Sequence, residues 1–174
     1  MITADTIIEK ELRKELIDLA FMQYGKEYIH GKKGSNAFDC AGFAWFIYKE
    51  LLNINIFYKG IGKSTTTKIM TSCYGELTLF TESLLQSNLN LIKEGDIVLF
   101  HTQSKEDNTP CVDNRYPGHC GIYLIDGYFI HCSNKKGGVV VDSIYENKKL
   151  GKKLVASKNI MSDNYALRKI INRN

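Results

Sequence analysis

Residues 41–48 read Ala-Gly-Phe-Ala-Trp-Phe-Ile-Tyr and are apolar on nearly every side of a helix. Such a helix is stable only when neighbouring elements cover most of its surface, so it must lie inside the fold. The run is too short to cross a bilayer, which takes roughly 20 apolar residues. Asp39 is a favourable N-cap type, and the pattern continues to about Leu52. We predict a buried helix over 39–52 with Cys40 in its first turn.

Apolar spacing along the rest of the chain predicts three more helices, over 6–23, 64–71 and 77–85. The second half is richer in short β-forming runs, at 97–100, 121–125, 128–131, 139–141 and 165–171. Helices followed by strands indicate an α+β fold, with N-terminal helices packed on an antiparallel sheet. The chain has 174 residues and shows no internal repeat or linker, so we expect a single domain over 1–174.

The charge pattern argues against a nucleic-acid or membrane partner. The net charge is +4, and the short basic runs lie in turn-like segments, where solvated loops are the simpler interpretation. The N-terminal residues are charged rather than apolar, so we read no secretory signal. We therefore expect no membrane association. Either the protein stays inside the cell, or it leaves by another route, or this sequence is a mature or trimmed form.

Five cysteines occur, at 40, 73, 111, 120 and 132. An odd count without a CxxC pair argues against a disulfide scaffold and for reduced thiols. A helix N-terminus favours the thiolate, so Cys40 is placed as a nucleophile would be, although a buried structural cysteine fits its position equally well. We expect the other four to be structural or incidental.

A nucleophilic thiol needs a base and a group that orients the base. His119 begins one predicted strand and His131 ends the next. A two-residue turn at Asp126-Gly127 would place the two histidines on opposite faces, whereas a three-residue loop with left-handed Gly127 would place them on one face within reach. Ordinary strand histidines are the alternative, and zinc binding with Cys120 and Cys132 is disfavoured, because adjacent strand residues point to opposite faces.

The chain contains three sequence blocks in this order: GKEYIHGKKGSNAFDCAGFAWFIYKEL, EGDIVLFH and PGHCGIYLIDGYFIHCS. Together they resemble the NlpC-type cell-wall cysteine peptidases, over roughly residues 10–145. The resemblance implies a papain-like fold. It also implies that Cys40 is the nucleophile, His119 the general base and His131 the residue that orients the base. Tyr28 and Asp39 match family positions beside the substrate.

Four residues depart from the family pattern. Ala41 replaces a serine, His30 a tryptophan, Lys32 a glycine and Cys120 a valine. All four bear on substrate preference, and none removes a catalytic group.

The implied function is peptidoglycan hydrolysis: an endopeptidase that cleaves stem peptides between D-glutamate and a diamino acid through an acyl-enzyme on Cys40. It calls for no metal or cofactor, and we expect a monomer. Loop 102–118 leads into His119, so we expect it to form one wall of the substrate groove. Alternatives are an acyltransferase or amidase that uses the same site on another substrate, and a binding domain with an inactive site. A phage or mobile-element enzyme, cytoplasmic until a tail or holin delivers it to the cell wall, would explain a bare catalytic domain.

Overall fold

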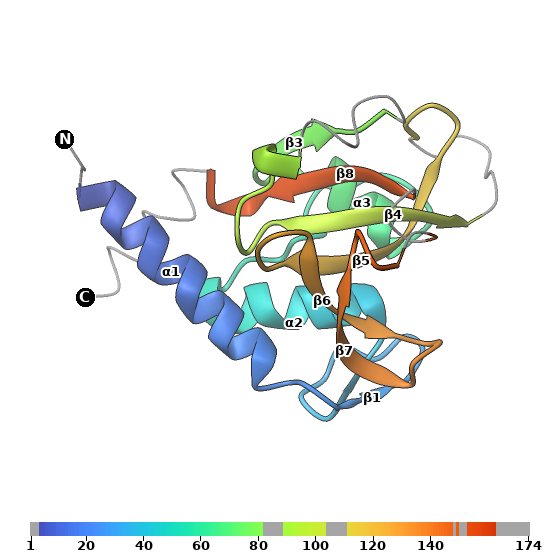
Figure 1. The fold of residues 1–174 in the computed structure, drawn as a ribbon, viewed down its shortest axis with the longest axis horizontal. Coiled ribbons are helices and arrows are strands. Elements are labelled where there is room, and N and C mark those ends of the chain that lie inside the picture. The colour runs from blue at the N-terminus through green and yellow to red at the C-terminus, as the bar shows by residue number, and fades with distance from the viewer. Residues whose placement is uncertain (1–3, 82–88, 104–110, 148, 150–152, 163–174) are drawn as a thin grey trace.

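The computed structural model describes residues 4–81, 89–103, 111–147, 149 and 153–162. Three helices precede most of the strands (Figure 1): α1 (Ala4–Phe21), α2 (Cys40–Leu52) and α3 (Thr65–Thr71). The strands are β1 (Glu27–Tyr28), β2 (Ala37–Phe38), β3 (Glu76–Leu79), β4 (Ile97–Gln103), β5 (Tyr116–Tyr123), β6 (Tyr128–Ser133), β7 (Gly138–Ser143) and β8 (Leu154–Asn159). Two 3₁₀ helices, η1 (Leu89–Leu91) and η2 (Ile160–Ser162), complete the described elements.

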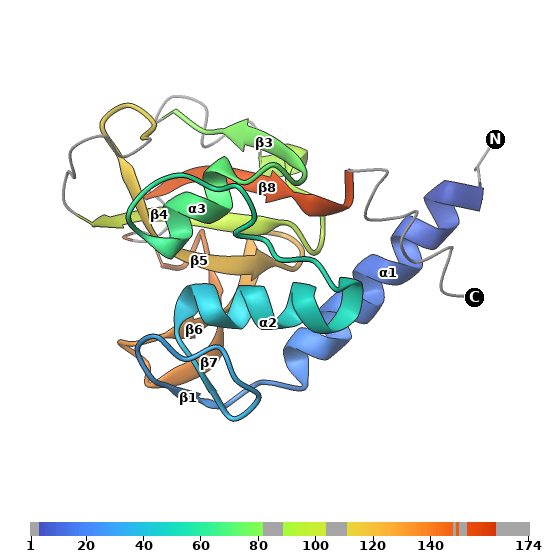
Figure 2. The same cartoon turned by 180° about the vertical axis from the view of Figure 1, so that it is seen from behind.

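The strands form one sheet in the order β2-β1-β7-β6-β5-β4-β8-β3, antiparallel except for the β1–β2 pair. Helices α2 and α3 lie on one face of this sheet, as Figure 2 shows, and α2 contacts β5 and β6. The predicted α+β architecture is confirmed.

Two hydrophobic clusters separate on the two faces of the sheet. The larger one packs α2 on the central strands and includes Phe43, Ile47, Cys120 and Cys132. The smaller one includes Phe100 and Phe129 and continues toward η1. The predicted burial of the second helix is confirmed, because its residues 41–44, 47, 48 and 52 are buried.

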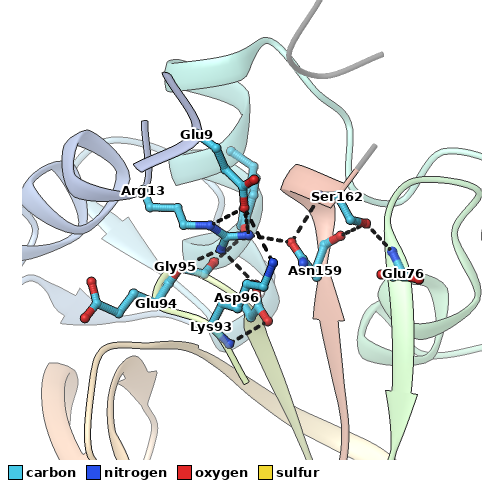
Figure 3. A network of polar contacts seen from close by, with 10 residues as sticks. Glu9, Arg13, Glu76, Lys93, Glu94, Gly95, Asp96, Asn159 and Ser162 are labelled. Carbon is cyan, nitrogen blue, oxygen red and sulfur yellow. Dashed lines mark hydrogen bonds and ion pairs between the residues drawn. The ribbon is translucent and has the colours of Figure 1, made fainter. Parts of the chain in front are cut away.

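Helix α1 is held against this body by a buried arginine (Figure 3). The Arg13 guanidinium donates to Asp96 Oδ1 at 3.0 Å, Asn159 Oδ1 at 2.8 Å and Glu9 Oε1 at 2.9 Å. Asp96 is 2% exposed, so this is a buried ion pair. It ties the N-terminal helix to the start of β4 and the end of β8.

One prediction in this part of the chain is wrong. Residues 77–79 lie in β3 rather than in a helix over 77–85, and residues 82–85 lie outside the described part. Leu77 and Leu79 are exposed, whereas the backbone pairs with β8, some 80 residues farther along the chain. The apolar spacing matched a helix, but these residues form a strand because their backbone pairs with this distant strand. The helix predicted over 64–71 is confirmed as α3, with Ser64 as its N-cap. The strand predicted over 165–171 lies outside the described residues.

Candidate active site

Cys40 is the first residue of α2, and Asp39 is the N-cap. One Asp39 carboxylate oxygen accepts the Gly42 amide at 2.6 Å, and the other accepts the Gly31 amide at 2.9 Å. One carboxylate therefore holds both the helix start and the segment before it. The amides of Cys40 and Ala41 lie in the first turn, where a helix offers them no acceptor, so they place partial positive charge beside the thiol.

Gly42 allows the preceding segment to cross very close to the helix start. A Cβ added at Gly42 would lie 2.0 Å from the Lys32 carbonyl oxygen. This same carbonyl accepts the Asp39 amide at 2.9 Å. Only glycine permits this approach, so Gly42 fixes the position of the segment relative to Cys40.

The hairpin between β5 and β6 brings His119 and His131 together. It pairs Ile122 with Ile130, which is the register of the three-residue alternative, and Gly127 is left-handed at φ +80°. His119 Nε2 lies 2.6 Å from His131 Nδ1, with the two rings edge to face. The two histidines are therefore in direct hydrogen-bond contact.

Aromatic rings and one glycine keep this pair in place. Phe129 packs on His131 with ring centroids 4.9 Å apart, and Phe100 lies 6.1 Å from the His119 ring. A Cβ at Gly121 would meet the Phe129 ring at 2.9 Å and His131 Cβ at 3.0 Å. The His131 side chain thus uses space that only glycine leaves on the facing strand.

The Cys40 thiol is partly exposed and has acidic character. A hydrogen bond from Cys120 and then one from His119 lower the pKa of Cys40 well below its ordinary value, although burial opposes them. Cys120 is fully buried, and its Sγ lies 3.3 Å from the Cys40 carbonyl oxygen, so its one S–H proton can reach either that oxygen or the Cys40 sulfur. The pKa of Cys120 is raised well above the ordinary value by the same contact and by burial, so Cys120 stays a thiol. Cys40 is therefore the thiolate of the pair, which is the reactive form.

Asp142 on β7 extends the pair and was missed from the sequence. Its Oδ2 lies 3.1 Å from His131 Nε2, and its Oδ1 lies 2.7 Å from Lys136 Nζ. The register places Asp142 opposite Phe129 and Val140 opposite His131, so Asp142 is the diagonal neighbour of His131. Continuing the predicted strand at 139–141 by one residue, and pairing it with the strand of His131, would have located it.

Tyr28 on β1 lies beside the thiol. Burial, followed by the charges of Cys40 and Asp39, raises the pKa of Tyr28, so its hydroxyl stays protonated. Ala41 is 1% exposed and packs in the larger cluster. The side chain at this position therefore does not face the solvent. His30 is exposed.

The three remaining cysteines lie in different surroundings. Cys132 is buried, with its Sγ donating to the Phe38 carbonyl at 3.3 Å, whereas Cys73 and Cys111 are exposed.

Within the described residues, no group of three or more His, Cys, Asp and Glu side chains is placed to hold a metal ion. No helix in the described ranges is long and apolar enough to span a membrane. The predicted loop over 102–118 is wrong at its ends, because residues 102–103 continue β4 and residues 116–118 begin β5. Residues 104–110 lie outside the described part of the chain.

A model of the NlpC/P60 family matches residues 25–158 of this chain. The chain belongs to the NlpC/P60 family. Helix α1 precedes the matched region.

Solved structures share the NlpC/P60 fold at low sequence identity. NlpC1 from Trichomonas vaginalis has a TM-score of 0.61 at 22% identity, over 85% of this chain and 44% of that chain. The NlpC/p60 domain of the peptidoglycan hydrolase SagA has a TM-score of 0.58 at 18% identity, over 84% and 97%. An N-acetylmuramoyl-L-alanine amidase from Bacteroides uniformis has a TM-score of 0.54 at 14% identity, over 85% and 97%. This chain thus spans less than half of NlpC1. No curated protein matches it.

Proposed function

We propose that this protein hydrolyses peptide bonds in peptidoglycan, with Cys40 as nucleophile, His119 as general base and His131 as the residue that orients the base. The observation that carries the proposal is the continuous contact from a helix-start thiol through His119 to His131. A nucleophile, a base and an orienting group in that order are what thiol hydrolysis needs. Membership of the NlpC/P60 family and the structural likeness to a peptidoglycan hydrolase support this substrate class.

In the first half-reaction, the Cys40 thiolate attacks the amide carbonyl carbon and a carbon–sulfur bond forms. The backbone amide of Cys40 stabilises the oxyanion that develops. His119 takes the Cys40 proton as the thiolate forms, and gives it to the leaving amine as the carbon–nitrogen bond breaks. In the second half-reaction, His119 takes a proton from water, the hydroxide attacks the thioester, and Cys40 leaves as thiolate with a carboxylic acid as the other product.

We further propose that the scissile bond joins D-glutamate to the diamino acid of the stem peptide. The Asp39 carboxylate lies at the helix start and keeps lone pairs beyond its two amide partners, so it can receive a free substrate amine. The protonated Tyr28 hydroxyl can donate to a substrate oxygen beside the thiolate. The connection from β4 to β5, which leads into His119, is proposed as one wall of the substrate groove.

The test is digestion of purified muropeptides by the wild type and by Cys40→Ala, with products identified by mass spectrometry. Cys73→Ala is the matched control, because it removes an exposed cysteine that lies outside the catalytic contacts. We expect the wild type and Cys73→Ala to release peptides that begin with the diamino acid, and Cys40→Ala to release none. Equal product from Cys40→Ala and the wild type would overturn the mechanism. Release of whole stem peptides from the sugar would show an amidase instead and overturn the assigned bond.

A further inference from the structure

The contact chain does not end at His131. Asp142 presents one carboxylate oxygen to His131 and the other to Lys136, at 3.1 and 2.7 Å. The side chains of Asp142 and His131 are 13% and 3% exposed, whereas that of Lys136 is 47% exposed. The Asp142–His131 contact is thus shielded from water, and the contact with Lys136 is not.

The identity of each partner determines where the protons lie. Burial opposes ionisation of Asp142, but hydrogen bonds from Lys136 and His131 outweigh it and hold the pKa of Asp142 below its ordinary value. A carboxylate only accepts, so His131 Nε2 carries a proton. Burial, followed by the charge of His119, lowers the pKa of His131 to about 4, so the ring is neutral at pH 7 and Nδ1 is bare.

The unprotonated Nδ1 of His131 then determines which ring nitrogen of His119 carries a proton. At 2.6 Å one of the two facing nitrogens must donate, and only His119 Nε2 can. Because Nε2 is committed to His131, Nδ1 is the nitrogen of His119 that remains to exchange a proton with Cys40. Hydrogen bonds made by the other ring nitrogen set a histidine tautomer in this way.

We propose that Asp142 is a positioning residue that sets the tautomers of His131 and His119, and so keeps His119 Nδ1 available as the base for Cys40. The role of the base rests on the proposed function, whereas the proton arrangement does not. The competing explanation is structural: Asp142 and Lys136 would only tie the turn after β6 to β7. A pair whose lysine is half exposed contributes little to stability.

The substitution that separates the two explanations is Asp142→Asn. The asparagine amide keeps the size of the side chain but can donate to His131 Nε2, so the reversed arrangement becomes available, in which His119 Nδ1 is protonated and cannot act as base. We expect turnover to fall on the order of 10- to 100-fold, as for other groups that orient a functional histidine. KM should change little, because Asp142 contacts His131 rather than the substrate.

The direct measurement is ¹⁵N NMR of histidine ring nitrogens in the whole protein carrying Cys40→Ala, where no thiol exchanges a proton with His119. With Asp142 in place, His131 and His119 should each show a protonated Nε2 and a bare Nδ1. Asp142→Asn should show the reversed tautomers as a substantial population. Lys136→Met is the control, because it removes the ion pair but leaves the carboxylate acceptor, and it should keep the wild-type tautomers and turnover.

The outcomes separate this proposal from the proposed function. Unchanged tautomers in Asp142→Asn, or the same change in Lys136→Met, would overturn the role of Asp142. Predicted tautomers together with a wild type that leaves muropeptides intact would overturn the hydrolase function alone.

Discussion

Replacing His131 with glutamine should remove most of the acid sensitivity that this histidine gives the fold. His131 is 2% exposed, and burial followed by the charge of His119 lowers its pKa from 6.5 to about 4. A histidine whose folded pKa is depressed binds its proton more readily in the unfolded chain. Its contribution to stability is therefore complete above pH 6.5 and declines as the pH falls toward 4.

The size of the effect follows from these two values. At pH 5 an unfolded His131 is almost fully protonated, whereas the folded ring is only about one-tenth protonated. Integrating the difference between pH 7.5 and pH 5 gives a loss of about 2 kcal/mol in the free energy of unfolding from this residue. Asp142, the nearest carboxylate, has a pKa below its ordinary value of 3.8 and stays ionised in this range.

Urea unfolding at pH 7.5 and pH 5 measures the loss, with fluorescence of the single tryptophan, Trp45, as the signal. The wild type should lose about 2 kcal/mol more than His131→Gln between the two pH values. The exposed His30 supplies the control, because a side chain in open solvent meets similar surroundings in both states, so His30→Gln should behave as the wild type. Identical losses for His131→Gln and the wild type would refute a neutral buried His131, and with it the derived proton arrangement.

Three further substitutions test other contacts. Cys120→Val removes the hydrogen bond that most lowers the pKa of Cys40, so iodoacetamide labelling of Cys40, resolved by mass spectrometry, should shift to higher pH. Gly42→Ala places a methyl group on a backbone carbonyl, and urea unfolding should show a loss of about 1–3 kcal/mol. Arg13→Met leaves Asp96 buried without its cation and should cost about 3–5 kcal/mol, most of which a further Asp96→Asn change should restore.

The parts of the site that the sequence predicted depend on local rules. Asp39 and the apolar run were sufficient to place Cys40 at the start of a buried helix, because capping and helix burial involve neighbours in sequence. The histidine contact depends on the turn between the strands, which left two registers open. The structure has left-handed Asp126 as well as Gly127, and the pairing Ile122–Ile130 that the longer loop required.

The parts that were missed depend on pairing between distant segments. Strand β3 exists because it pairs with β8, and nothing near Leu77 in the sequence indicates that partner. Asp142 lies 11 residues after His131 and becomes its neighbour only through the β6–β7 register. The contact between Cys120 and Cys40 joins a strand to a helix 80 residues earlier, so nothing near Cys120 in the sequence indicates that its thiol lowers the pKa of Cys40.

The alternation of side chains along β5 explains why one short segment can serve both the proposed base and the proposed nucleophile. His119 and Cys120 are adjacent, so a strand turns them to opposite faces. His119 lies with Phe100 beside the smaller cluster, whereas Cys120 belongs to the larger cluster under α2. A shift of one residue in the β5 register would exchange the two and place a thiol against His131 and an imidazole in the core. The register of β5 therefore determines both the position of the proposed base and the acidity of Cys40. The left-handed turn at Gly127 is thus as important to the proposed chemistry as the residues in contact with Cys40.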